Sequence, residues 1–275
     1  MANITASDVK RLRESTGAGM MDCKNALMEN DGDFDKAVEY LRVKGQAGVA
    51  KREGRATANG LVATHTEDGF GVLVEVNCET DFVAKGERFQ DLGRQVLEQA
   101  VAVKATDVAG LLESSLPTGG TVSDLVVDAI ATIGEKIQIG RLARIEASHV
   151  ASYLHKTNPD LPPQVGVLVG ATGAADVVRD VAMHVAAMIP VYLDRDSVPE
   201  DVVANERRIA EETAREEGKP EKALPRIVEG RVNGFFKDKV LVDQAFARDN
   251  KKTVGAVLAE AGVSATGFAR FRVGA

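Results

Sequence analysis

The chain has 275 residues, of which 44% are hydrophobic and 27% are charged; these proportions exclude wholesale disorder and leave room for two modest domains. The formal net charge of −7 argues against a dedicated nucleic-acid binder, because neutralising phosphates requires clustered Lys and Arg side chains. Two cysteines and a start without a basic, apolar leader are typical of a cytoplasmic protein, and no apolar run approaches the ~18 residues that a membrane span needs.

The N-terminal part of the chain predicts three short helices. Thr5 and Asp8 have the spacing of a capping box at the start of the first helix, and Asp33 precedes the third as its N-cap. We assign residues 1–46 to a three-helix domain and the small, basic stretch 47–59 to a linker. The apolar positions that recur at helical spacing in the second and third helices are Met20, Cys23, Leu27, Phe34, Ala37, Val38 and Leu41.

A β-hairpin is predicted next. Asp68-Gly69 separates two segments of strand-like composition, Leu61–Thr66 and Phe70–Val76, and Asp-Gly between apolar runs is a strong hairpin signal. The second segment contains the apolar run of a buried strand. The elements expected after it are a helix with Phe89, Leu92 and Val96 on one face, a helix over Ser123–Ile133 and a strand over Ile139–Ile145.

The chain then repeats itself. Gly71-Val72-Leu73-Val74 recurs as Gly166-Val167-Leu168-Val169, followed by a helical stretch over Asp176–Met188, and Leu142-Ala143-Arg144-Ile145 recurs as Phe268-Ala269-Arg270-Phe271. Two matched pairs in the same order favour an α+β fold whose core is two duplicated α+β subdomains. The expected subdomains are residues 60–147 for the first, and residues 148–198 with 231–275 for the second.

An insertion interrupts the second copy. The stretch Pro199–Gly230 is highly charged and is broken by Gly218-Lys219-Pro220, which predicts two antiparallel helices joined by a turn. We therefore expect an inserted helical hairpin, a coiled coil, over residues 199–230. This hairpin could dimerise, contact a partner or remain solvated, and its sequence does not distinguish these roles.

No motif predicts a metal site or a cofactor. Asp31, Asp33 and Asp35 alternate as in a calcium loop, but Lys36 and Arg42 stand where that loop requires Gly and Glu. The four histidines are scattered without metal-ligand spacing, and neither a dinucleotide-binding nor a Walker pattern is present. We expect no metal and no cofactor.

The segment Thr80-Asp81-Phe82-Val83 lies at a corner between the predicted strand and a helix. Local physics favours Asp81 as a helix cap and Phe82 as a core residue of the first turn. The alternative is that Phe82 is exposed to a partner with Asp81 beside it, where a buried aromatic would contribute strongly to binding. Cys78, just before the corner, gives a third option, a catalytic nucleophile, although a cysteine after a strand is more often a small buried residue.

Five blocks of this sequence carry a family resemblance: Thr16–Lys24, Asn77–Lys85, Met183–Ala187, Val228–Arg231 and Lys252–Gly255. They resemble the elongation factor Ts family, and the resemblance extends from Ile4 to about Gly274. It implies a three-helix N-terminal domain similar to ubiquitin-associated domains, a duplicated α+β core and an inserted coiled coil. Some members also have a C-terminal helical module beyond the last strand, and we expect its contacts to be absent or replaced here because this sequence stops at Ala275.

The resemblance implies a cytoplasmic guanine-nucleotide exchange factor, not an enzyme, whose partner is the translation GTPase elongation factor Tu. Phe82 would insert beside the magnesium site of the GTPase, Asp81 would support the displacement of magnesium, and Thr80 and Val83 would shape the inserted corner. His184 would face a different domain of the partner, and the N-terminal domain would dock on the nucleotide-binding domain. Whether the complex forms a higher-order assembly stays open.

The duplication favours the exposed role of the corner. The matching corner of the second copy, Gly170-Ala171-Thr172-Gly173-Ala174, has neither Asp nor Phe. A fold that needed a packed aromatic at this turn would be expected to keep one in both copies. A helical adaptor that binds a protein through its N-terminal domain is the main alternative function, and a Cys78 enzyme is the weaker one.

Overall fold

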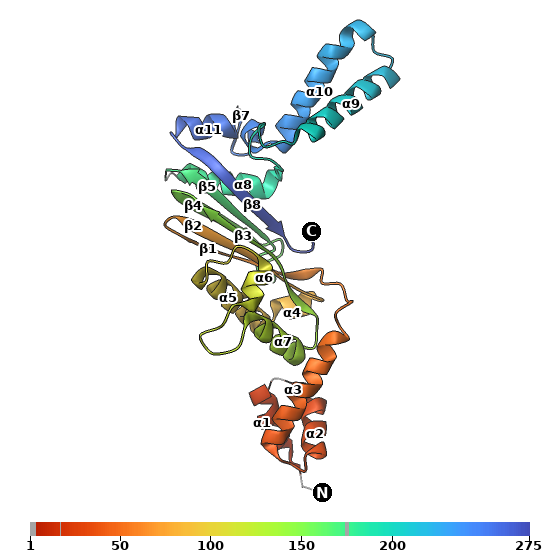
Figure 1. Cartoon of the computed structure of the whole chain (residues 1–275), viewed down its shortest axis with the longest axis vertical. Coiled ribbons are helices and arrows are strands. Elements are labelled where there is room, and N and C mark those ends of the chain that lie inside the picture. The colour runs from red at the N-terminus through yellow and green to blue at the C-terminus, as the bar shows by residue number, and fades with distance from the viewer. Residues whose placement is uncertain (1–3, 17, 174–175) are drawn as a thin grey trace.

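The computed structural model describes residues 4–16, 18–173 and 176–275. The molecule is elongated: a three-helix module lies at one end, two sheets with their helices form the middle, and a helical hairpin extends from the other end (Figure 1). This architecture confirms the predicted α+β class. Gly17, in the block Thr16–Lys24, and Ala174, at the end of the second-copy corner that begins at Gly170, lie outside the described residues.

The N-terminal module begins with the predicted capping box. The Thr5 amide donates to the Asp8 carboxylate at 3.1 Å and the Asp8 amide donates to Thr5 Oγ1 at 3.2 Å, so both first-turn donors are satisfied. Asp33 caps the third helix by accepting from the Lys36 amide at 3.1 Å. The three helices are α1 (Ala6–Thr16), α2 (Met20–Glu29) and α3 (Phe34–Ala50).

Helix α3 continues to Ala50, so it extends into the stretch 47–59 that was expected to be a linker. Close to this stretch, Gly45 lies in a helix–helix contact between α3 and α7 (Val122–Ile133). A Cβ atom built on Gly45 would lie only 2.4 Å from the Ala131 Cβ, so glycine is what allows the two backbones to approach this closely. Tertiary packing therefore extends the helix through a sequence with linker composition.

Two three-stranded antiparallel sheets form the middle of the molecule, in the orders β1-β2-β3 and β4-β5-β8. The GVLV repeat occupies the central strand of each sheet. A two-stranded hairpin of β6 (Ala245–Phe246) and β7 (Asp249–Thr253) lies apart from them. The six sheet strands are β1 (Asn59–Glu67), β2 (Phe70–Cys78), β3 (Ile137–Glu146), β4 (His149–His155), β5 (Val165–Thr172) and β8 (Ser264–Arg272).

Strand register supports the duplication. Val72 is paired with Arg144 in the first sheet, and Val167 is paired with Arg270 in the second, so the two repeated segments meet in the same alignment in both copies. The register also shifts at equivalent places, after Glu75 in β2 and after Gly170 in β5. A bulge at the same position in both central strands is a shared structural feature rather than a local defect.

The two sheets pack against each other, and helices cover their outer faces (Figure 1). Within each GVLV repeat the two valines face the helices, while the glycine and the leucine face the other sheet. The residues between the sheets are Val62, Leu73, Val150, Leu168 and Phe271. The covering helices are α4 (Asp81–Lys85), α5 (Glu87–Ala102), α6 (Val108–Glu113) and α7 on the first sheet, and α8 (Asp176–Met188) and α11 (Val254–Glu260) on the second.

The inserted hairpin consists of α9 (Glu200–Glu216) and α10 (Leu224–Lys239), which pack against each other. Gly218, with φ of 71°, supplies the left-handed residue of the turn. Helix α10 continues beyond residue 230, where the insertion was expected to end, because Val232 and Phe236 are buried at the base of the hairpin. The hairpin is therefore anchored by apolar contacts at its base.

Candidate functional site

Helix α4 starts one residue before the position expected from the sequence, because Thr80 rather than Asp81 is its N-cap. Thr80 Oγ1 accepts from the Val83 amide at 3.3 Å. Asp81 is the first helical residue, and its carboxylate lies 2.9 Å from Lys85 Nζ. The hydrogen bond and charge of Lys85 lower the pKa of Asp81, so this carboxylate is ionised at neutral pH at an exposed corner.

Phe82 is 85% exposed, and the interpretation of this residue as a core staple is therefore wrong. The inner face of α4 is occupied instead by Ala84, which is fully buried, and by Val83, which packs against the first core cluster. Consecutive helical residues point in directions about 100° apart, so the burial of Val83 and Ala84 turns Phe82 outward. No other large hydrophobic side chain among the described residues is this exposed.

Cys78 is fully buried at the end of β2. Burial raises the pKa of its thiol to about 12, so the reactive thiolate is absent at neutral pH. The thiol instead donates to the Thr80 carbonyl oxygen at 3.2 Å, which helps to fix the corner. The nucleophile interpretation of Cys78 is excluded on these grounds.

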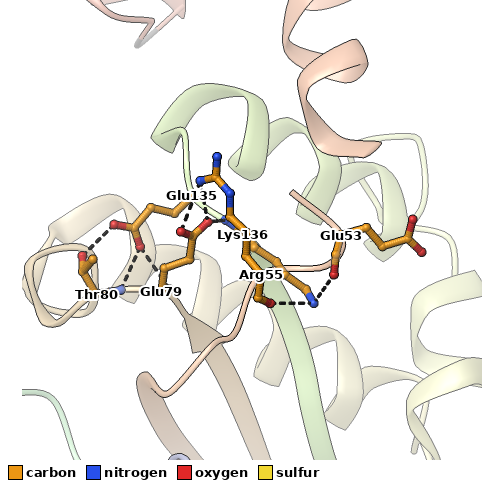
Figure 2. Close-up of polar contacts among 6 residues, drawn as sticks. All are labelled: Glu53, Arg55, Glu79, Thr80, Glu135 and Lys136. Atoms are coloured by element: carbon orange, nitrogen blue, oxygen red, sulfur yellow. Dashed lines mark hydrogen bonds and ion pairs between the residues drawn. The ribbon is translucent and has the colours of Figure 1, made fainter. Parts of the chain in front are cut away.

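A second segment of the chain contacts the corner, and its role was not predicted from the sequence. Glu135, between α7 and β3, directs its carboxylate at Glu79 and Thr80, and Lys136 beside it contacts the segment that follows α3 (Figure 2). These residues are distant from the corner in sequence, so only the tertiary structure identifies them. Gly134, with φ of 87° at the end of α7, was the one local indication of a chain reversal there.

His184 lies on α8 and is 1% exposed. The Ala247 amide donates to its Nδ1 at 3.1 Å, so the proton is on Nε2, which lies 2.8 Å from Gln244 Oε1 and donates to it. The ring also contacts Phe246 at a centroid distance of 5.8 Å. His184 is therefore buried in this chain, where it organises the segment 244–247, and its contact with a partner stays a prediction.

The comparisons with known proteins agree with this architecture. A family model described as Elongation factor TS matches residues 79–275. Curated proteins named Elongation factor Ts from Acidothermus cellulolyticus and Kineococcus radiotolerans are 63% and 62% identical, covering 100% of this chain and 99% and 100% of their own lengths. The chain belongs to the elongation factor Ts family. The relative from Thermobifida fusca is 55% identical over the same full extent of this chain.

The residues expected from the elongation factor Ts resemblance occupy two separate places. Thr80, Asp81, Phe82 and Val83 form one contiguous corner at the start of α4, which covers the first sheet. His184 lies on α8, which covers the second sheet on the opposite side of the core (Figure 1). The structure therefore gives this family member one exposed aromatic corner and one buried histidine network, and does not bring them together.

Neither of two further site types is found in the described part of the chain. No group of three or more His, Cys, Asp or Glu residues there could hold a metal ion. No helix in the ranges 4–16, 18–173 and 176–275 is both long enough and apolar enough to cross a membrane.

The buried His184 predicts a pH-dependent stability. Burial lowers the pKa of His184 below its ordinary value of 6.5, so the folded chain resists protonation that the unfolded chain accepts. The stabilisation is complete above about pH 6.5 and is lost as the pH falls towards the folded pKa, at a slope of at most ~1.4 kcal/mol per pH unit. Thermal unfolding between pH 7.5 and 5 should show this decline, and His184→Gln should reduce it.

The matched control is His155→Gln, which removes an exposed histidine from β4. This variant should leave the decline in place. An unchanged decline in His184→Gln would contradict the assignment to the buried ring.

Proposed function

We propose that this chain exchanges guanine nucleotide on elongation factor Tu in the cytoplasm by inserting Phe82 into the GTPase. Family membership makes the chain an exchange factor of translation elongation that binds elongation factor Tu, and not an enzyme. The observation that carries the role of Phe82 is its 85% exposure on a helix turn that is held by the Thr80 cap and by the packing of Val83 and Ala84. An exposed aromatic on a rigid support is the type of side chain that dominates binding energy in protein interfaces.

The corner is suited to act on the magnesium site of the partner. Magnesium bridges the nucleotide phosphates to a GTPase, so displacing its ligands removes a large local charge and weakens GDP binding. The Phe82 side chain would insert beside the magnesium site as a wedge, and the ionised Asp81 would supply a negative charge next to it. Thr80 and Val83 support the wedge through the cap and the core contact that orient α4. Because the turn is already ordered, little entropy is lost when it docks.

Thermodynamic linkage limits what Phe82 can contribute. An exchange factor that weakens GDP binding must itself be bound more weakly by the GDP form, to the same factor. Burying a phenylalanine is worth about 1.5–3 kcal/mol, and each tenfold change in affinity requires ~1.4 kcal/mol. Phe82 alone can therefore lower the affinity of the GTPase for GDP by about 10- to 100-fold, and other contacts must provide any further loss of affinity.

The test is the release of fluorescently labelled GDP from elongation factor Tu. Phe82→Ala should release GDP about 10- to 100-fold more slowly than the wild type, from the burial arithmetic, with an unchanged melting temperature because the side chain is exposed. Asp81→Ala should give a smaller loss. Val103→Ala, which truncates another exposed apolar side chain, is the matched control and should exchange normally.

Two outcomes would contradict the proposal. Full activity of a folded Phe82→Ala protein would exclude the wedge. Binding of elongation factor Tu by the wild type without any acceleration would favour the adaptor function, for which α2 offers a surface with exposed Met20 (54%), Met21 (64%) and Met28 (51%). Under the proposal, those methionines belong to the docking face of the N-terminal domain.

A further inference from the structure

Helix α4 has only five residues, Asp81–Lys85, which is too short to be stable by its own hydrogen bonds. Of these residues only Ala84 is fully buried, so apolar packing fixes one side of the turn and leaves its start unsupported. The amides of Glu79 and Thr80, where β2 ends, need acceptors that neither the sheet nor the helix supplies. The orientation of Phe82 therefore depends on what satisfies this junction.

The carboxylate of Glu135 supplies the acceptors that the Glu79 and Thr80 amides need. One carboxylate oxygen accepts from the Glu79 amide at 3.1 Å and from the Thr80 amide at 3.0 Å, and the other accepts from Thr80 Oγ1 at 2.6 Å. These are charge-assisted hydrogen bonds, which are stronger than neutral ones. Because Thr80 Oγ1 also accepts from the Val83 amide, the Glu135 carboxylate fixes the hydroxyl that caps α4.

Lys136, the next residue, donates to the corner instead of accepting from it. Its amide donates to Glu79 Oε1 at 2.6 Å, which with the Arg55 guanidinium lowers the pKa of Glu79 and keeps that carboxylate ionised. Its ammonium group donates to the carbonyl oxygens of Glu53 at 2.6 Å and Arg55 at 3.1 Å. Arg55 closes the cluster by donating to both Glu79 oxygens at 3.2 Å (Figure 2).

The cluster therefore connects three parts of the chain: the corner, the link between α7 and β3, and the segment that leaves the N-terminal module. We propose that Glu135 is a positioning residue for nucleotide exchange, which holds Phe82 in its inserting orientation through the Glu79–Thr80 junction. This inference rests on the proposed function of Phe82. Glu135 acts through the cap of α4, and it needs no contact of its own with the GTPase.

The test is a double-mutant cycle on labelled GDP release, measured over a range of exchange-factor concentrations. Glu135→Gln replaces one carboxylate oxygen by an NH2 group, so it removes a charged acceptor while keeping the size of the side chain. The maximal release rate should fall about 3- to 10-fold, the size of effect expected for the loss of one net hydrogen bond because the amide oxygen of Gln can still accept the others, with a smaller change in the half-saturating concentration. In the Phe82→Ala background the same substitution should change the rate less than about twofold, because coupled residues are non-additive.

A structural readout accompanies the kinetics. Hydrogen exchange of the Glu79 and Thr80 amides in the full chain should be faster in Glu135→Gln, while the Val74 amide in the middle of β2 keeps its wild-type protection. Unchanged exchange of the two corner amides would overturn the inference even if the variant were less stable overall. Glu113→Gln, at an exposed position on α6, is the matched control and should retain normal release.

The outcomes separate the inference from the function on which it rests. If Phe82→Ala and Glu135→Gln both slow release and their losses multiply in the double variant, Glu135 does not act through Phe82, and the inference fails while the proposed function stands. If Glu135→Gln releases GDP at the wild-type rate, the inference also fails. If Phe82→Ala is fully active, the proposed function fails, and the inference that Glu135 acts through Phe82 fails with it.

Discussion

Replacing Gly166 by valine should lower the free energy of unfolding by about 3 kcal/mol, because the new side chain has no room between the two sheets. A Cβ atom at this position would lie 2.4 Å from Val62 Cγ1 and 2.7 Å from Leu73 Cδ1. Val62 is β-branched and stiff, so it cannot rotate away at low cost. The sheets would have to separate, and the apolar contacts between them would be weakened together.

Thermal and urea unfolding of the full chain would measure this effect. A loss of ~3 kcal/mol corresponds to about 6–12 °C in melting temperature for a chain of this size. The matched control is Gly234→Ala in α10, where the added Cβ meets nothing within 4 Å and the helix should gain up to ~1 kcal/mol. A Gly166→Val protein as stable as the wild type would show that the sheets do not require glycine at their contact.

The repeat that reveals the duplication in the sequence is also the contact that holds the two copies together. Gly71 and Gly166 lie where the sheets approach each other, and a Cβ on Gly71 would be 2.8 Å from Val150 Cγ1. A four-residue match is weak as a sequence signal, yet here each residue has a direction: glycine and leucine towards the other sheet, valine towards the helices. The period of two along a strand explains why the pattern predicted the fold correctly.

The corner was predicted less well, because its conformation is set by residues distant in sequence. Local rules made Asp81 the cap and buried Phe82, whereas in the structure Thr80 caps α4 and Val83 and Ala84 face the core. Glu135 contributes to this difference by holding Thr80, and no spacing rule connects positions 80 and 135. The family resemblance indicated the exposed role of Phe82, but the geometry that supports the exposure came only from the structure.

A buried charge was missed for the same reason. The run Val72–Val76 predicts a buried strand, and the strand is buried, but it includes Glu75, which is 3% exposed. Its carboxylate accepts from Arg141 Nε at 2.5 Å and from Asn77 Nδ2 at 2.9 Å. Arg141 also donates to the Arg272 carbonyl oxygen at 2.7 Å, and its Cζ atom lies 4.8 Å from the centroid of the Phe271 ring. Because Phe271 and Arg272 belong to the second sheet, this one arginine connects the two subdomains.

Removing Arg141 should therefore be among the most destabilising single changes in the chain. Arg141→Met keeps much of the apolar stem but leaves Glu75 as a buried carboxylate without its cation, which should cost about 3 kcal/mol or more. The double variant Glu75→Leu, Arg141→Met removes both charges and should recover most of that loss, because an apolar pair of similar volume avoids the cost of burying charge. Urea unfolding of the two variants beside the wild type measures the difference. A double variant no more stable than Arg141→Met would assign the loss to the contacts with Phe271 and Arg272 instead of the unpaired charge.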